Sequence, residues 1–162
     1  MIALSDILVA TDFSEPSAAA LTYGRELARH FESTLHVVHV VGTMQSAFSG
    51  AAVAAVSLSD LQQQAEDAAR QELADLLIDD GAPPPVRQVI ITSNSPAGAI
   101  VDYARQRGVG LIVAGTRGRG AVAHALIGSV AERVVRTAPC PVLTVRHPER
   151  EFVVPVADRS TH

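Results

Sequence analysis

The sequence contains no lysine, so all thirteen of its basic residues are arginine. This absence excludes Schiff-base chemistry, the lysine of a Walker A loop and the strand lysine of protein kinases. If the chain binds phosphate groups, their charge must be met by backbone N–H groups, by arginine or by a metal ion. A biased genome composition explains the missing lysine equally well, and the exclusion holds in either case.

Cysteine and aromatic residues are also scarce. Cys140 is the only cysteine, which excludes an intrachain disulfide, a CxxC pair and a thiolate metal cage. Aromatic residues make up 4% of the chain, so few rings are available to stack on nucleic-acid bases. The net charge of −4 argues against the phosphate neutralisation that nucleic-acid binding requires. We therefore expect no nucleic-acid partner.

Long hydrophobic runs are missing as well. No apolar run approaches the roughly 20 residues that span a bilayer, and residues 1–9 lack the basic segment and apolar stretch of a signal peptide. We expect no membrane partner and a cytoplasmic location. The 162 residues, 48% hydrophobic and 19% charged, fit a single globular domain.

Short apolar runs alternate with helical patterns along the chain, which predicts an α/β fold with a parallel sheet and helices on both faces. Strands are predicted at 7–10, 35–41, 86–92, 109–114 and 141–146. Helices are predicted at 14–31, 58–80, 95–107 and 129–136. We expect Ser14 to cap the first helix, and Val130 and Val134 to face inward in the last one. Residues 42–60 are expected to form a mobile connection.

Two of the predicted strand ends carry residues suited to ligand binding, which in open parallel sheets occurs beyond the carboxyl ends of the strands. One is Thr11-Asp12-Phe13-Ser14, and the other is the glycine-rich stretch 115–120. A polyphosphate between Gly118 and the helix start at Gly128-Ser129 would meet backbone amides from both sides. A simple turn explains such a loop equally well. It is not the dinucleotide fingerprint, because the turn after the first strand contains no glycine.

The spacing Gly115-x2-Gly118-x9-Gly128-Ser129 resembles the nucleotide-binding motif in the ATP-binding branch of the universal stress protein family. The flanking segments 111–114 and 139–145 also resemble the family, and 7–14 and 35–40 look like its first two strands. The resemblance covers residues 2–146 in order. It implies a nucleotide-binding domain at 1–146, followed by a C-terminal tail at 147–162.

The resemblance further implies a Rossmann-like, open five-stranded parallel sheet of order 3-2-1-4-5 with an ATP site at its carboxyl edge. The implied contacts are Ala10, Thr11, Asp12 and Val40 for adenine, Asp12 and Gly115 for ribose, and Gly118, Gly128, Ser129 and the amide of Val130 for the phosphates. Where Gly110 and Ala114 stand, the family often has an acidic and a larger apolar residue, so Ala114 would leave a looser base or ribose pocket. The family also commonly pairs as a homodimer through its last strand, here 142–145, which would cover that edge.

Several side chains near this site keep two interpretations. Asp12 either contacts ribose and carries Mg2+ (or Mn2+), or caps the helix beside Ser14. Arg117 and Arg119 either clamp phosphates or are solvated loop charges. Ser129 is a ligand, a helix cap or both.

The two histidines of the second predicted strand are His36 and His39. Because they are three residues apart on a strand, they point to opposite faces and cannot form a metal-binding pair. We expect both to be packing residues.

Three functions remain open from the sequence. The first is a nucleotide-binding stress-response regulator, in which ATP with Mg2+ orders the glycine loop. The second is an enzyme that uses Asp12 and a metal for slow ATP hydrolysis, autophosphorylation or adenylyl transfer. The third is a dimeric interaction protein that binds no nucleotide. The HExxH and GxSxG patterns are absent, and we predict no catalytic residue and no particular protein partner.

Overall fold

The structure is a computed structural model that describes residues 3–43, 58–78, 84–116 and 127–147. Within these ranges, no helix is long and apolar enough to cross a membrane. In chain order the elements are β1 (Asp6–Ala10), α1 (Glu15–Phe31), β2 (Thr34–Val41), α3 (Leu58–Leu76), β3 (Val86–Thr92), α4 (Pro96–Arg107), β4 (Leu111–Gly115), α5 (Ser129–Thr137) and β5 (Val142–Val145).

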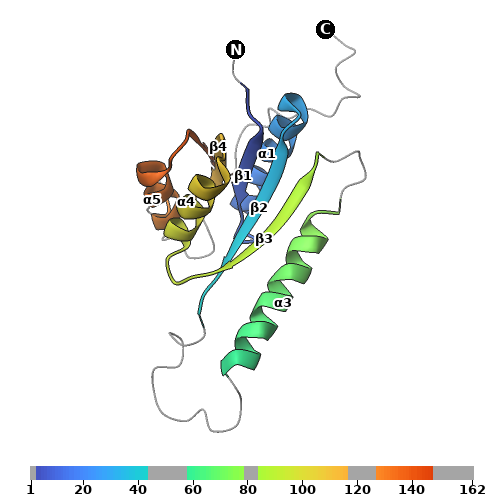
Figure 1. Ribbon diagram of the computed structural model, residues 1–162, viewed down its shortest axis with the longest axis vertical. Helices are drawn as coiled ribbons and strands as arrows, with labels where there is room; N and C mark the ends of the chain where they lie inside the picture. The colour runs from blue at the N-terminus through green and yellow to red at the C-terminus, as the bar shows by residue number, and fades with distance from the viewer. Residues whose placement is uncertain (1–2, 44–57, 79–83, 117–126, 148–162) are drawn as a thin grey trace.

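The strands form one parallel sheet of order β3-β2-β1-β4-β5, which confirms the predicted fold class (Figure 1). Helices α1 and α3 pack on one face of the sheet, and α4 and α5 pack on the other. The chain changes faces after β3, so β1 and β4 lie side by side with their crossover helices on opposite faces. This arrangement defines the point where the strand order reverses.

The central strand β1 is buried on both faces, as its uninterrupted apolar sequence predicts. Ile7 and Val9 pack toward α1 and Leu8 packs toward α4, all with no exposed surface. Burial of each such side chain contributes about 1.5–3 kcal/mol. Strand β1 therefore contributes to the core on both faces of the sheet, and its carboxyl end leads into the predicted site.

Two predicted details of the helices are wrong. Helix α3 ends at Leu76 rather than at residue 80, because the amides of Leu77 and Ile78 bond to carbonyls three residues back, which tightens the last turn. In α5 the buried residues are Ala131 and Val134, while Val130 is 39% exposed. Residues three apart share a helix face, and Val130 lies on the flank of that face.

His36 and His39 do lie on opposite faces of β2, but both do more than pack. His36 is buried, and its Nε2 and Nδ1 lie 2.8 Å from Asp6 Oδ1 and from the Tyr103 hydroxyl. Burial raises the pKa of Tyr103 above its ordinary value, so the hydroxyl remains protonated at neutral pH. This polar chain joins β1, β2 and α4 near the amino edge of the sheet, opposite the predicted site.

Candidate functional site

The predicted site lies where the carboxyl ends of β2, β1 and β4 stand next to one another in the sheet. The strand order reverses between β1 and β4, and in open α/β sheets ligands bind in the crevice at such a point. Ala10 at the end of β1 and Val40 near the end of β2 are half-buried, whereas the core residues earlier in these strands are fully enclosed. The two strand ends are therefore less enclosed than the rest of their strands.

The turn after β1 is held by hydroxyl groups. The Thr11 side chain is buried, and its Oγ1 accepts a hydrogen bond from the Phe13 N–H at 3.1 Å and lies 3.1 Å from Ser17 Oγ. The Ser17 hydroxyl also donates to the Ser14 carbonyl at 2.9 Å. These bonds tie the turn to the first turn of α1, so the backbone here is rigidly placed.

Asp12 projects from this turn and is half-buried. Its Oδ1 accepts hydrogen bonds from both the N–H and the hydroxyl of Ser14. Ser14 stands at the N-cap position of α1, but its side chain makes no capping bond, so that prediction is wrong: the hydroxyl is held by Asp12 instead. No cluster of three or more His, Cys, Asp or Glu side chains that could hold a metal ion occurs among the described residues.

Strand β2 runs past the end of β1, so the backbone of its last residues has no β1 strand beside it. The bonds Leu35 N–H to Pro85 O and Ser93 N–H to Val41 O show that odd-numbered residues of β2 face β3. The even-numbered ones face β1, as the bond from Thr11 N–H to Val38 O shows. The N–H and C=O of Val40 therefore point beyond the end of β1, and no backbone partner meets them there within the described ranges.

The end of β4 packs tightly against the start of α1. A Cβ on Gly115 would lie 2.8 Å from both the backbone carbon and the oxygen of Pro16, closer than any side chain tolerates. The structure therefore gives Gly115 a packing role, besides the ribose contact that the family resemblance implies. Ala114 is buried just before it.

The residue that follows β4 and the residue that precedes α5 are hydrogen-bonded to each other. The Gly128 N–H donates to the Thr116 carbonyl at 2.7 Å, and the Thr116 N–H donates to the Val145 carbonyl at 2.8 Å. The start of α5 therefore lies directly beside the carboxyl end of β4, as the glycine motif predicts. Arg117, Gly118 and Arg119 lie outside the described residues.

The N-terminus of α5 presents amides that no carbonyl of the helix itself can meet. Gly128 is extended at φ −71° and ψ 154°, and its N–H is already bonded, so the amides that lack an intrahelical partner begin at Ser129 and Val130. Ser129 and Val130 are both exposed, and Gly128 before them is half-buried. Two such N–H groups at the positive end of a helix dipole suit a phosphate group.

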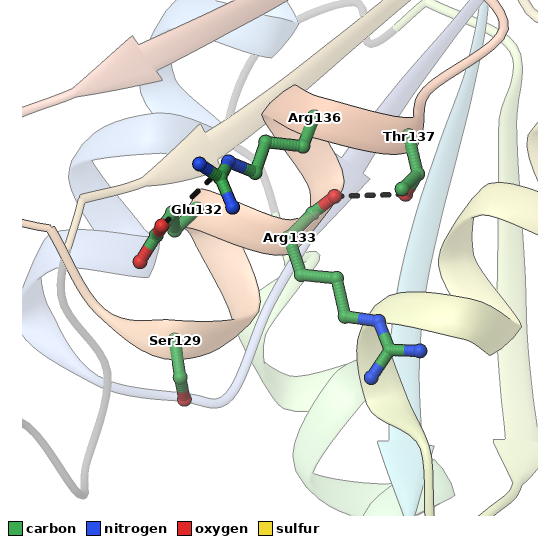
Figure 2. Close-up of a pocket in the computed structure, with 5 residues that line it drawn as sticks. All are labelled: Ser129, Glu132, Arg133, Arg136 and Thr137. Carbon is green, nitrogen blue, oxygen red and sulfur yellow. Dashed lines mark hydrogen bonds and ion pairs between the residues drawn. The ribbon is translucent and has the colours of Figure 1, made fainter.

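A hollow of about 380 Å3 lies along α5, and Figure 2 shows the side chains that line it. The Ser129 side chain lies at one end of it, and the ion pair between Arg136 and Glu132 (3.8 Å) lies farther along the helix. The lining residues in the described ranges are Ser129, Glu132, Arg133, Arg136 and Thr137. They come from α5 alone, so Ser129 is the one residue of the predicted site among them.

Sequence reasoning missed the contacts of Ser17 and His39 at these strand ends, and it named Phe13 only as part of the turn after the first strand. Phe13 has a left-handed backbone (φ 62°), and its ring packs against His39 at a centroid distance of 4.3 Å. His39 Nδ1 lies 2.9 Å from the Thr11 carbonyl oxygen. The sequence predicted only that His39 lies on the face of the strand opposite His36. That prediction does not identify the Thr11 carbonyl as its partner.

The sheet order and the helices on both faces define a Rossmann-like α/β domain. The model of the universal stress protein family matches residues 4–146, and the chain belongs to this family. A universal stress protein of Methanocaldococcus jannaschii is 29% identical over 145 residues, which is 90% of this chain and 84% of the relative. The structure of UspA from Lactobacillus plantarum matches with a TM-score of 0.70 at 29% identity, covering 90% of this chain and 100% of that one.

Two other solved members of the fold contain adenine nucleotides. One is a universal stress protein in complex with cAMP (20% identity, TM-score 0.58, 90% of this chain and 98% of that one). The other is the Archaeoglobus fulgidus protein in complex with dAMP (21% identity, TM-score 0.54, 90% of this chain and 99% of that one). At these identities they share the fold with this chain.

Proposed function

We propose that this chain is an ATP-binding stress-response regulator that holds ATP with Mg2+ at the carboxyl ends of β1, β2 and β4. The observation that carries the proposal is the bond between Gly128 and Thr116, because it brings the start of α5 to the switch point of the sheet. A chain without lysine must neutralise phosphates in another way, and the amides of Ser129 and Val130 supply one. Relatives of the same fold that hold cAMP or dAMP support an adenine nucleotide.

Each part of the nucleotide has a matching group at the site. The backbone N–H and C=O of Val40 meet the edge of the base, Asp12 and Gly115 meet the ribose, and the α5 N-terminus meets the phosphates. Mg2+ usually takes only one or two protein carboxylates and completes its shell with phosphate oxygens and water. The half-buried carboxylate of Asp12, oriented by Ser14, fits that mode.

The test compares two substitutions at Ser129, the first residue of α5. Ser129→Pro removes the amide proton and the hydroxyl, while Ser129→Ala removes the hydroxyl alone. Proline is well tolerated at the first helical position, and Gly128 before it is already extended, so the fold should persist. We expect ATP affinity to fall by about 10- to 100-fold in Ser129→Pro, which corresponds to one charge-assisted hydrogen bond, and by less in Ser129→Ala.

The measurements are thermal shift and calorimetric titration of ATP and Mg2+, together with phosphate release. At 100 times the Kd, wild type should gain about 2.7 kcal/mol of stability, a rise in Tm of roughly 5–10 °C for a domain of this size. Turnover should stay below about one per minute, far under the usual ~1–1000 per second of enzymes. A folded wild type that shows no shift would refute the nucleotide site, and faster turnover would favour an enzyme.

The proposal includes a homodimer through β5. This strand pairs with β4 on one side, and it has no other strand neighbour in the described part of the chain. The carbonyls of Pro141 and Val145 face β4, so the N–H and C=O of Thr144 face outward. Val142, Leu143 and Thr144 are half-buried, and an open edge of this kind favours pairing with a second copy.

Thr144→Pro removes an outward N–H without removing a bond to β4, and it should convert the dimer to monomer. Thr144→Val, which keeps the N–H, should remain dimeric. Light scattering during size-exclusion chromatography measures the mass directly. A monomeric wild type, or a Thr144→Pro variant that still dimerises, would contradict pairing through this edge.

A further inference from the structure

The carbonyl of Thr11 departs from the pairing of the parallel sheet. Ala10 is opposite Val38, and the Thr11 N–H donates to the Val38 carbonyl at 2.9 Å. If β1 continued, the Thr11 carbonyl would next accept the N–H of Val40. Instead His39 Nδ1 lies 2.9 Å from that carbonyl oxygen. A carbonyl can only accept, so Nδ1 carries the proton, and it does so in both charge states of the ring.

Two further features hold this arrangement. Phe13 has a left-handed backbone at φ 62°, which turns the chain away from the strand direction and costs about 1–3 kcal/mol for a bulky residue. Its ring packs against the His39 imidazole in a tilted arrangement, with the ring planes 36° apart. The Phe13 N–H is bonded to the Thr11 side chain at 3.1 Å. His39 therefore contacts the turn at two points, through its Nδ1 and through the face of its ring.

We propose that His39 is a positioning residue of the nucleotide site: by holding the Thr11 carbonyl, it ends β1–β2 pairing and keeps the Val40 N–H and C=O available to the base. This inference rests on the proposed function for its ligand. The claim that His39 ends β1–β2 pairing, and so leaves the Val40 N–H and C=O without a partner in β1, does not depend on which ligand binds. Val40 is half-buried and follows His39 directly in β2, and no backbone group within the described ranges bonds to its N–H or C=O on the side of β1.

The test uses His39→Leu, which removes the donor, and His39→Asn, whose side-chain amide can reach the Thr11 carbonyl as Nδ1 does. Hydrogen exchange at the Val40 amide is measured by NMR without nucleotide. We expect rapid exchange in wild type and in His39→Asn, and protection in His39→Leu, where the Thr11 carbonyl becomes free to accept from Val40. ATP affinity should fall about tenfold or more in His39→Leu, the loss of roughly one hydrogen bond, and recover in His39→Asn.

The two measurements separate the two ideas. If wild type binds no ATP but the Val40 amide behaves as expected, the proposed function fails and the role of His39 in ending the strand pairing stands. Equal Val40 exchange in wild type and in a folded His39→Leu variant would overturn that role. Unchanged ATP affinity in folded His39→Leu would overturn the role in binding. A loss of affinity in His39→Asn as large as in His39→Leu would also overturn it, because the donor would then be irrelevant.

Discussion

Replacement of Gly115 by alanine is expected to lower the free energy of unfolding by about 1–3 kcal/mol and to weaken ATP binding by about tenfold or more. The new Cβ would lie 2.8 Å from the backbone carbon and oxygen of Pro16, and backbone atoms cannot rotate aside as a side chain can. The start of α1 must move away from β4. Asp12 and Ser14 are hydrogen-bonded to each other immediately before α1, so they would move with it. Urea unfolding without nucleotide and calorimetric titration of ATP with Mg2+ measure the two effects.

Gly42→Ala is the matched control, since it makes the same chemical change just after β2. No atom lies within 4 Å of a Cβ at Gly42, so stability should change by no more than about 0.5 kcal/mol. Retention of full stability in Gly115→Ala would show that the α1–β4 contact yields easily. A loss of stability with unaltered ATP affinity would place the ligand away from the turn that carries Asp12.

The sequence predicts the strands well because each is a short apolar run between residues that end strands. Strand β3 has the predicted bounds, and the other strands differ by one or two residues at their ends. Parallel strands covered on both faces need continuous apolar sequence, which is a local signal. The order of the strands is not local. It came from resemblance to the family, and the structure confirms it.

The site was harder to predict because its main contacts join distant parts of the chain. Gly115 looks like one glycine of a phosphate loop, and nothing nearby in the sequence indicates that Pro16 packs against it. The bond from His39 to the Thr11 carbonyl joins residues 28 positions apart, so strand periodicity gives the face of His39 but not its partner. The spacing of Gly128 and Ser129 did predict the start of α5 correctly, because helix starts depend on neighbouring residues.

The second large effect is expected at Gly24, in the middle of α1. A Cβ at this position would lie 2.2 Å from Cγ2 of Val9, which is fully buried in β1. Valine is stiff at χ1 and the interior is close-packed, so the side chain cannot turn away. Gly24→Ala should therefore cost about 1–3 kcal/mol from overpacking, reduced by the roughly 1 kcal/mol that alanine gains over glycine in a helix.

Val9→Ala provides the matched test, because it removes the methyl group that the new Cβ would strike. Alone it should cost roughly 1–3 kcal/mol by leaving a cavity in the core. In the double variant, the Cβ that Gly24→Ala introduces enters part of that space, so the combined cost should be at least about 1 kcal/mol smaller than the sum of the two single costs. Urea unfolding of all four proteins completes the cycle. Strictly additive costs would mean that α1 shifts away from β1 instead of meeting Val9, and the close approach at Gly24 would then not be what fixes the distance between the helix and the sheet.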